Sequence, residues 1–138
     1  MLDRDEVDTA CPRHPEVQSR TDRAVAAVNK AGGKTLPPAV FGTLVHTNLR
    51  NQIRDLHDPN FRAEVSLLKG EEEGYGKRGS IRIDVLERVG NGVVCAYDIK
   101  TGDAKLTERR VSEIMKNVYG AYPETNRIII IQTKPSKR

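Results

Sequence analysis

Hydrophobic residues recur every three or four positions over one long segment in the first half of the chain. This segment is residues 39–57, and its apolar positions are Val40, Phe41, Leu44, Val45, Leu49, Ile53 and Leu56. A stripe at this spacing predicts an amphipathic helix. A shorter helix is predicted over residues 22–31, with Thr21 as its N-cap and Gly32-Gly33 as its stop.

The first 20 residues show no comparable pattern. They hold two prolines, many charges and few large apolar side chains. A segment of this composition buries too little apolar surface to fold by itself. Residues 1–20 are therefore expected to be a flexible lead-in or a linker, and residues 21–138 to form a single domain.

Further along the chain, apolar and polar residues alternate, which is the pattern of β-strands with one buried face. The alternation predicts strands over residues 63–69, 80–88 and 93–100. Gly90-Asn91-Gly92 is a hairpin signal, so the last two strands are expected to pair antiparallel. The charged segment between the first two strands, with its three glutamates at 71–73, is expected to be a solvated loop.

The last third of the chain completes a mixed sheet. Thr107 is a good N-cap for a helix that Gly120 is expected to end, and "RIIIIQ" (residues 127–132) is expected to be a central strand. A strand, helix, strand succession is a right-handed crossover, so the strands 93–100 and 127–132 should be parallel. The expected fold is therefore α/β (α+β), with a mixed central β-sheet and flanking helices.

Composition narrows the class of partner. The chain of 138 residues carries a formal net charge of +4 at pH 7, with a pI near 9.2, which mildly favours an anionic partner. No apolar run approaches the roughly 20 residues of a membrane-spanning helix, so no membrane partner is expected. Cys11 and Cys95 are too few for a disulfide framework or a four-thiolate zinc site, which favours a reducing compartment or indifference to redox conditions.

Charged residues gather where the second hairpin strand ends in the sequence Tyr-Asp-Ile-Lys. Asp98 and Lys100 are two residues apart and share a strand face, and Asp84 can join them across the hairpin. Glu64 is available from the neighbouring strand, where the alternatives are that it faces solvent as the polar residue of an edge strand or that a glutamate of residues 71–73 takes its place as a ligand. Hard divalent cations prefer carboxylates and keep water and substrate phosphate as further ligands. The predicted metal ligands are therefore these three acids and the carbonyl of Ile99.

An aspartate and a lysine at this spacing are, taken alone, commonly a surface ion pair worth under ~1 kcal/mol. Together with Asp84 and the strand end they favour metal-assisted phosphodiester cleavage, with Mg²⁺ as the expected ion and Mn²⁺ or Zn²⁺ as alternatives. The metal would polarise the phosphate. Lys100 would orient water or stabilise the charge of the transition state. His46, near the apolar stripe of its helix, is expected to be packed rather than catalytic.

These residues carry a resemblance to a known family. An aspartate on one hairpin strand and Asp-x-Lys on the next, with 13 residues between Asp84 and Asp98, resembles the PD-(D/E)xK, or restriction-endonuclease-like, nuclease superfamily. The wider sequence is similar to the nuclease domains at the C-terminal ends of bacterial polymorphic toxins, including contact-dependent growth inhibition effectors. The likeness covers about residues 40–132. By this resemblance the catalytic set is Glu64, Asp84, Asp98 and Lys100.

The resemblance also implies a restriction-endonuclease-like core and a biological setting. The substrate would be nucleic acid, DNA or tRNA, the partner a cognate immunity protein, and the place of action the cytoplasm of a target cell, reached as part of a larger delivered protein. The chain departs from the family pattern in two places. Ile83 stands where the superfamily name has proline, and the helix 39–57 lacks the glutamate that many relatives keep, which leaves the fourth ligand unassigned.

Basic residues near the acids are predicted to contact substrate phosphates: Lys77, Arg78, Arg82, Lys105 and Arg109. Such contacts give salt-sensitive, largely sequence-independent binding. Two other functions stay open, a nucleic-acid-binding module without catalysis and a protein-interaction domain whose acidic cluster docks a basic partner. Metal-dependent cleavage that disappears in Lys100→Ala separates the nuclease from both.

Overall fold

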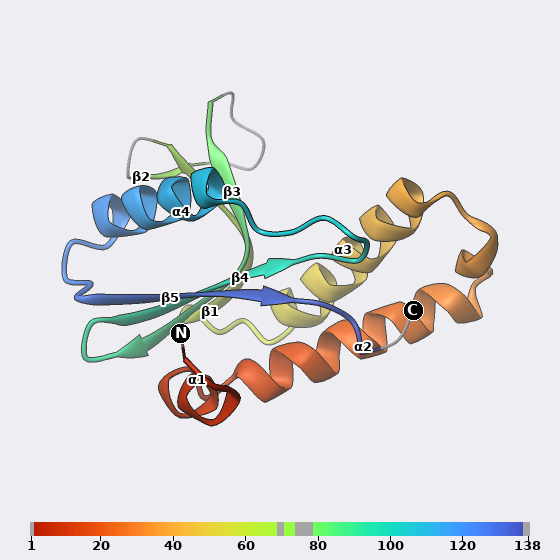
Figure 1. Cartoon of the computed structure of the whole chain (residues 1–138), viewed down its shortest axis with the longest axis horizontal. Coiled ribbons are helices and arrows are strands. Elements are labelled where there is room, and N and C mark those ends of the chain that lie inside the picture. The colour runs from red at the N-terminus through yellow and green to blue at the C-terminus, as the bar shows by residue number, and fades with distance from the viewer. Residues whose placement is uncertain (1, 69–70, 74–78, 137–138) are drawn as a thin grey trace.

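The computed structural model describes residues 2–68, 71–73 and 79–136, and within them it forms one mixed β-sheet (Figure 1). The strands lie in the order β2-β1-β3-β4-β5. Strand β5 is parallel to β4, and every other neighbouring pair is antiparallel. The strand bounds are β1 Phe61–Leu68, β2 Glu71–Glu73, β3 Ile81–Gly90, β4 Val93–Ile99 and β5 Arg127–Thr133. The expected antiparallel hairpin and the parallel crossover are confirmed.

Helices cover both faces of the sheet, which confirms the expected α+β class. On one face lie α1 (Arg4–Ala10), α2 (His14–Lys30) and α3 (Pro38–Arg54). The short 3₁₀ helix Gly33–Thr35 lies between α2 and α3 in the chain. Helix α4 (Glu108–Ala121) lies on the other face. Two hydrophobic clusters follow from this arrangement, one between the sheet and α2/α3 and one between the sheet and α4.

Local sequence explains where the helices begin. Thr107 accepts a hydrogen bond from the backbone N–H of Arg110 at 3.1 Å and caps α4, as expected. Helix α2 instead starts at His14, with a proline in its first turn. Thr21 is therefore not a cap. It is buried inside α2, where its hydroxyl donates to the carbonyl of Val17 at 2.7 Å.

The N-terminal segment differs from the expected flexible lead-in. Residues 4–20 are almost entirely helical, and α1 begins with a capping box in which Asp3 accepts from the N–H of Glu6. Val17 and Cys11 are fully buried in the cluster beneath the sheet. The expectation was wrong because the few apolar residues of this segment are spaced to face a surface that later parts of the chain supply.

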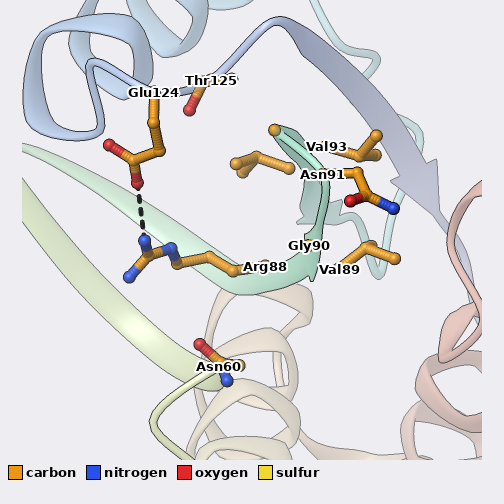
Figure 2. A pocket seen from close by; sticks show the side chains of 10 residues that line it. Asn60, Arg88, Val89, Gly90, Asn91, Val93, Glu124 and Thr125 are labelled. Atoms are coloured by element: carbon orange, nitrogen blue, oxygen red, sulfur yellow. Dashed lines mark hydrogen bonds and ion pairs between the residues drawn. The ribbon is translucent and has the colours of Figure 1, made fainter.

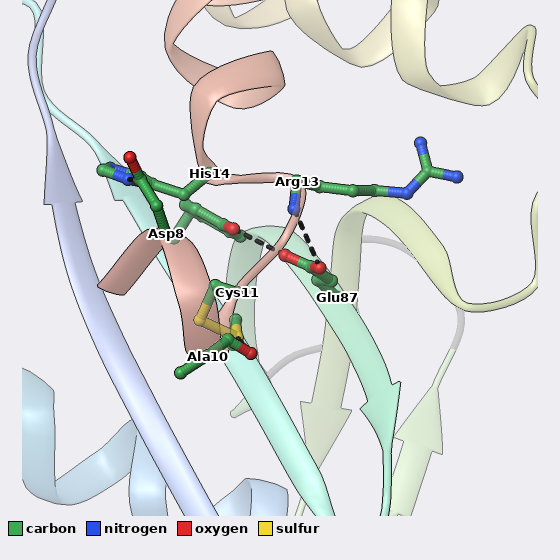
Figure 3. The surroundings of a disulfide bond; sticks show 8 residues. Asp8, Ala10, Cys11, Arg13, His14 and Glu87 are labelled. Atoms are coloured by element: carbon green, nitrogen blue, oxygen red, sulfur yellow. Dashed lines mark hydrogen bonds and ion pairs between the residues drawn. A yellow bond between two sulfur atoms is a disulfide. The ribbon is translucent and has the colours of Figure 1, made fainter. Parts of the chain in front are cut away.

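A disulfide joins Cys11, between α1 and α2, to Cys95 in the middle of β4 (Figure 3). The two cysteines are too few for a framework, but they form this single bond, contrary to the expectation of a reducing compartment or redox indifference. Beside it, the carboxylate of Glu87 accepts from the Tyr97 hydroxyl at 2.6 Å and from the Arg13 N–H at 3.1 Å. The start of α2 is thus fixed to the central strands by the disulfide and by the hydrogen bond from Arg13 to Glu87, while the Tyr97–Glu87 hydrogen bond joins β4 to β3.

Two smaller expectations also change. Strand β5 lies at the sheet edge rather than at its centre, and Glu71–Glu73 form strand β2 against β1 instead of a loop. After β5, the chain returns to α2, where the Ser136 N–H donates to Asp22 at 2.7 Å. In the part of the chain that the structure describes, no helix has both the length and the hydrophobicity to cross a bilayer.

The disulfide predicts a measurable loss of stability on reduction. The bonded cysteines are 84 residues apart, and closing a loop of this length in the unfolded chain is worth about 4–5 kcal/mol in the chain-entropy model. The free energy of unfolding, measured by guanidinium denaturation, is expected to fall by about that amount in the reduced chain and in Cys11→Ala with Cys95→Ala. Equal denaturation midpoints for the oxidised and reduced chains would contradict this role.

Candidate active site where strands β3 and β4 separate

In strands β1 and β3, the alternation of side chains between the two faces of the sheet is interrupted at positions that lie opposite each other. In β1, Ala63 lies in the α2/α3 cluster while Val65 lies in the α4 cluster, although strict alternation would put both on one face. In β3, Ile83 and Val85 are divided between the clusters in the same way. The ladder pairs Ala63 with Val85 and Val65 with Ile83 but skips the position between them.

That skipped position is occupied by Glu64 and Asp84. Glu64 has a left-handed backbone conformation, with φ 51°, which accounts for the change of phase in β1. Strict alternation along β3 would place Ile81, Ile83 and Val85 on one face, but Val85 lies on the other. As a result, Glu64 and Asp84, which lie opposite each other on neighbouring strands, both depart from the regular alternation of side chains between the two faces of the sheet.

Strands β3 and β4 also part at this level. Their ladder begins with Val85 opposite Tyr97 and continues toward the hairpin turn, and Figure 1 shows β3 curving away from β4 beyond it. The separation opens a cleft of about 560 Å³. Its lining includes residues from β3, from the end of β4 and from α3 and α4, among them His46, Arg82, Asp84, Asp98, Lys100 and Arg110.

Asp84 is held at the point of separation by the backbone of β4. Its Oδ2 accepts a hydrogen bond from the Ile99 N–H at 2.8 Å, a donor that no longer has a β3 carbonyl opposite it in the ladder. Its Oδ1 lies 3.7 Å from Nδ1 of His46. Burial raises the pKa of the Asp84 carboxyl above its ordinary value, and the nearby charge of Asp98 adds to the rise.

Asp98, on β4, is the buried acid on the wall of the cleft opposite Asp84. Lys100 Nζ lies 3.1 Å from its Oδ2, yet this oxygen is buried and accepts no hydrogen bond. The pair is therefore not the solvated surface ion pair that the spacing alone would suggest, because Asp98 is only 4% exposed. The structure thus brings Asp84, Asp98 and Lys100 into one cleft, with the two carboxylates close enough for their charges to interact.

Helix α4 contributes Arg110, whose contact with the acids was not expected from the sequence. Arg110 Nε lies 3.8 Å from Oδ1 of Asp98, and an Nη2 hydrogen of Arg110 is donated to the backbone carbonyl of Arg82. Arg110 therefore bridges both walls of the cleft. The sequence signal for this contact was the position of Arg110 three residues after the cap Thr107, because the cap fixes where the side chains of the first helical turn point.

Helix α3 contributes His46 on the other side. It was expected to be packed, but its side chain is 23% exposed and faces Asp84. The helix approaches the end of β4 closely, since a Cβ on Gly42 would lie only 2.8 Å from Oγ1 of Thr101.

Glu64 is not gathered with the other acids. It lines a different cleft, beside Arg54 and Ser66, and its Oε2 lies 3.6 Å from Nη1 of Arg50 on α3. Among the described residues, the only set of three His, Cys, Asp or Glu side chains whose ligand atoms lie within 4.8 Å of one another is Cys11, Glu87 and Cys95. That set is closed by the disulfide, so it is poorly suited to a metal ion.

The predicted phosphate contacts are spread widely. Arg82 lines the cleft. Lys105 is exposed in the loop before α4, and the side chain of Arg109 is 92% exposed with Glu113 3.5 Å away. Lys77 and Arg78 lie outside the described residues. The side chain of Ile99 is buried in the α2/α3 cluster, and its backbone lines the cleft.

A separate hollow of about 220 Å³ lies at the hairpin end of the sheet (Figure 2). Arg88 and Glu124 form an ion pair of 2.7 Å across it, and Arg88 stacks on Tyr122. Asn91 and Gly92, both with positive φ, form the two-residue turn that the sequence predicts. None of the predicted site residues lines this hollow, so the candidate chemistry lies at the opposite end of the strands.

No family model matches the chain, and neither the curated proteins nor the solved structures include a significant match to it. The geometry of the cleft is therefore the basis on which its chemistry is argued.

Because the pKa of Asp84 is raised, ionised Asp84 is expected to destabilise the metal-free chain. A carboxyl whose folded pKa lies above its unfolded value is more costly to ionise in the folded state, so at pH 7 a neutral isostere is favoured. Asp84→Asn keeps an acceptor for the Ile99 N–H and is expected to raise the melting temperature in EDTA. The control Asp103→Asn, in an exposed loop, should leave it unchanged. A lower melting temperature for Asp84→Asn would show that ionised Asp84 stabilises the fold.

Proposed function

We propose that the chain is a metal-dependent nuclease domain that hydrolyses phosphodiester bonds, with the cation bound between Asp84 and Asp98. The observation that supports this most is the placement of two carboxylates, Asp98 buried and Asp84 half-buried, from two separating strands in one cleft, with a lysine ammonium 3.1 Å from Asp98. Mg²⁺-type sites commonly use one or two carboxylates and leave the remaining positions to water and phosphate.

The two acids fit such an ion chemically. Asp98 Oδ2 is buried without a hydrogen bond, and the raised pKa of Asp84 reflects burial and the nearby second carboxylate. Two carboxylates arranged in this way repel each other, and a divalent cation removes that repulsion. The set lacks thiolates and holds at most one imidazole, which favours Mg²⁺ or Mn²⁺ over Zn²⁺.

Each neighbouring residue has a separate task. When bound, the divalent ion supplies Lewis-acid polarisation of the scissile phosphate. The Ile99 N–H fixes the direction of the Asp84 carboxylate, and Arg110 holds Asp98 from α4. Lys100 presents an ammonium at the mouth of the cleft, where it can stabilise the extra negative charge of the phosphoryl transition state and orient the attacking water.

His46 is placed to accept or donate a proton beside Asp84 or to serve as a further metal ligand. A helix residue that completes the carboxylate pair is what the restriction-endonuclease-like resemblance leads one to expect, with imidazole here in place of a carboxylate. By the same resemblance the domain would be the nuclease of a bacterial polymorphic toxin, acting on DNA or tRNA in a target cell and blocked by an immunity protein.

The first test concerns the metal. Mn²⁺ or Mg²⁺ at 100 times its dissociation constant is expected to stabilise the folded chain by about 2.7 kcal/mol, since binding to the native state alone adds that free energy. Asp98→Asn should abolish the metal-induced rise in melting temperature, while Asp103→Asn should keep it. An absent shift in the wild-type chain would favour a protein-docking role for the acids.

The second test concerns catalysis. Plasmid DNA and total tRNA are incubated with the protein and Mg²⁺, Mn²⁺ or Zn²⁺, and cleavage of at least one substrate is expected. Lys100→Ala should lower the rate by about 10²–10³-fold, the usual effect of removing one group that stabilises transition-state charge. The matched control Lys116→Ala, exposed on α4, should cleave normally. Binding without cleavage under all conditions would support the non-catalytic nucleic-acid-binding module instead.

A further inference from the structure

A second cleft, of about 480 Å³, lies between the C-terminal half of α3 and strand β1. We propose that this cleft is a nucleobase subsite that binds a guanine of the substrate through the carboxylate of Glu64. The proposal deepens the proposed function and rests on it, because it assumes that the ligand is nucleic acid.

The cleft contains polar atoms that the protein leaves unsatisfied. Oε2 of Glu64 and Oγ of Ser66 are buried and take part in no hydrogen bond. The nearest cation to Glu64 is Arg50, at 3.6 Å. Burying such groups without a hydrogen bond costs free energy. Since neither atom is accessible from the open cleft, a ligand recovers this cost when the side chains of Glu64 and Ser66 turn toward its donors. Both atoms belong to side chains lining the same open cleft.

Backbone strain fixes the carboxylate in this place. Glu64 has a φ of 51°, in the left-handed region that is unfavourable for residues other than glycine. Continuing the alternation of Phe61 and Ala63, which lie in the α2/α3 cluster, would have pointed residue 64 toward α4. The strained conformation instead brings its side chain to the α3 side, next to Arg50, although Asp84 and Asp98 form their cleft without it.

The donors that fit a carboxylate acceptor are those of guanine. Its N1–H and N2–H₂ lie side by side on one edge, whereas adenine, cytosine and uracil each present an acceptor on the corresponding edge. Unpaired bases are read on this edge when they are splayed out of a strand.

The path from the first cleft to the second is marked by nitrogen-bearing side chains on one side of α3. His46 faces Asp84, Arg50 faces Glu64, and Arg54 lines the guanine cleft. Residues four apart lie on the same side of a helix, and the eight positions that separate His46 from Arg54 correspond to about 12 Å along the helix axis. A nucleic-acid strand that runs along this side of α3 would place the bound guanine a few nucleotides from the phosphodiester bond that is cut.

The subsite is tested without catalysis or metal. Wild-type protein in EDTA is titrated with GMP, AMP, CMP and UMP, and binding is followed by NMR chemical-shift changes. GMP is expected to bind at least about tenfold more tightly than the other three, with the shifts centred on Glu64, Ser66 and Arg54. Glu64→Gln, which keeps the size of the side chain but adds an NH₂ donor, should remove this preference, while Glu108→Gln, exposed at the start of α4, should retain it.

Equal affinity for the four nucleotides, or a GMP preference that survives Glu64→Gln, would overturn the proposal. If Glu64→Gln does not fold, Arg54→Ala is the second test of this cleft. Arg54 would contact the nucleotide phosphate, so its loss should weaken the binding of all four nucleotides alike and leave the preference for GMP intact. The two proposals fail separately. Cleavage of nucleic acid without a preference for GMP rejects the subsite alone, and a GMP preference without any cleavage rejects the nuclease alone.

Discussion

The hydrogen bond from the Ile99 N–H to the carboxylate of Asp84 is the interaction on which the rest of the site depends. It forms where the ladder between β3 and β4 stops, so a side chain takes the place of a backbone partner and the strands are free to separate. The separation creates the cleft and puts Asp84 and Asp98 on its two walls. Without this bond Asp84 would have no fixed direction, and a buried N–H would lack an acceptor.

The remaining structure supplies walls for this opening. The disulfide and the Glu87 contacts fix the start of α2 to β3 and β4, and α2 in turn supports α3, which carries His46 and Arg50. Cys95 lies three residues before Asp98 on the same strand. The covalent bond and the candidate site therefore share one rigid element, and a change in the packing of β4 affects both. On the other face, α4 brings Arg110 to Asp98.

The regular parts of the fold could be predicted from sequence because they follow local rules. The Asn91-Gly92 turn, the Thr107 cap and the isoleucine strand gave the hairpin, α4 and the parallel crossover. The grouping of Asp98 with Lys100 followed from period-two alternation. The phase change at Glu64 could not be foreseen, because alternation assumes a regular strand and nothing local marks a left-handed glutamate. The N-terminal helices and the disulfide depend on contacts with residues more than 70 positions away, which no window of sequence contains.

The most direct test of the central claim is a crystal structure of the protein grown with Mn²⁺, using the anomalous signal of the ion to locate it. The proposed site requires one strong anomalous peak within about 2.0–2.6 Å of an oxygen of Asp84 and of an oxygen of Asp98, the distances of hard-cation coordination. A Mn²⁺ peak elsewhere, or none at saturating metal with both carboxylates still unbridged, would contradict the claim that these two acids share an ion.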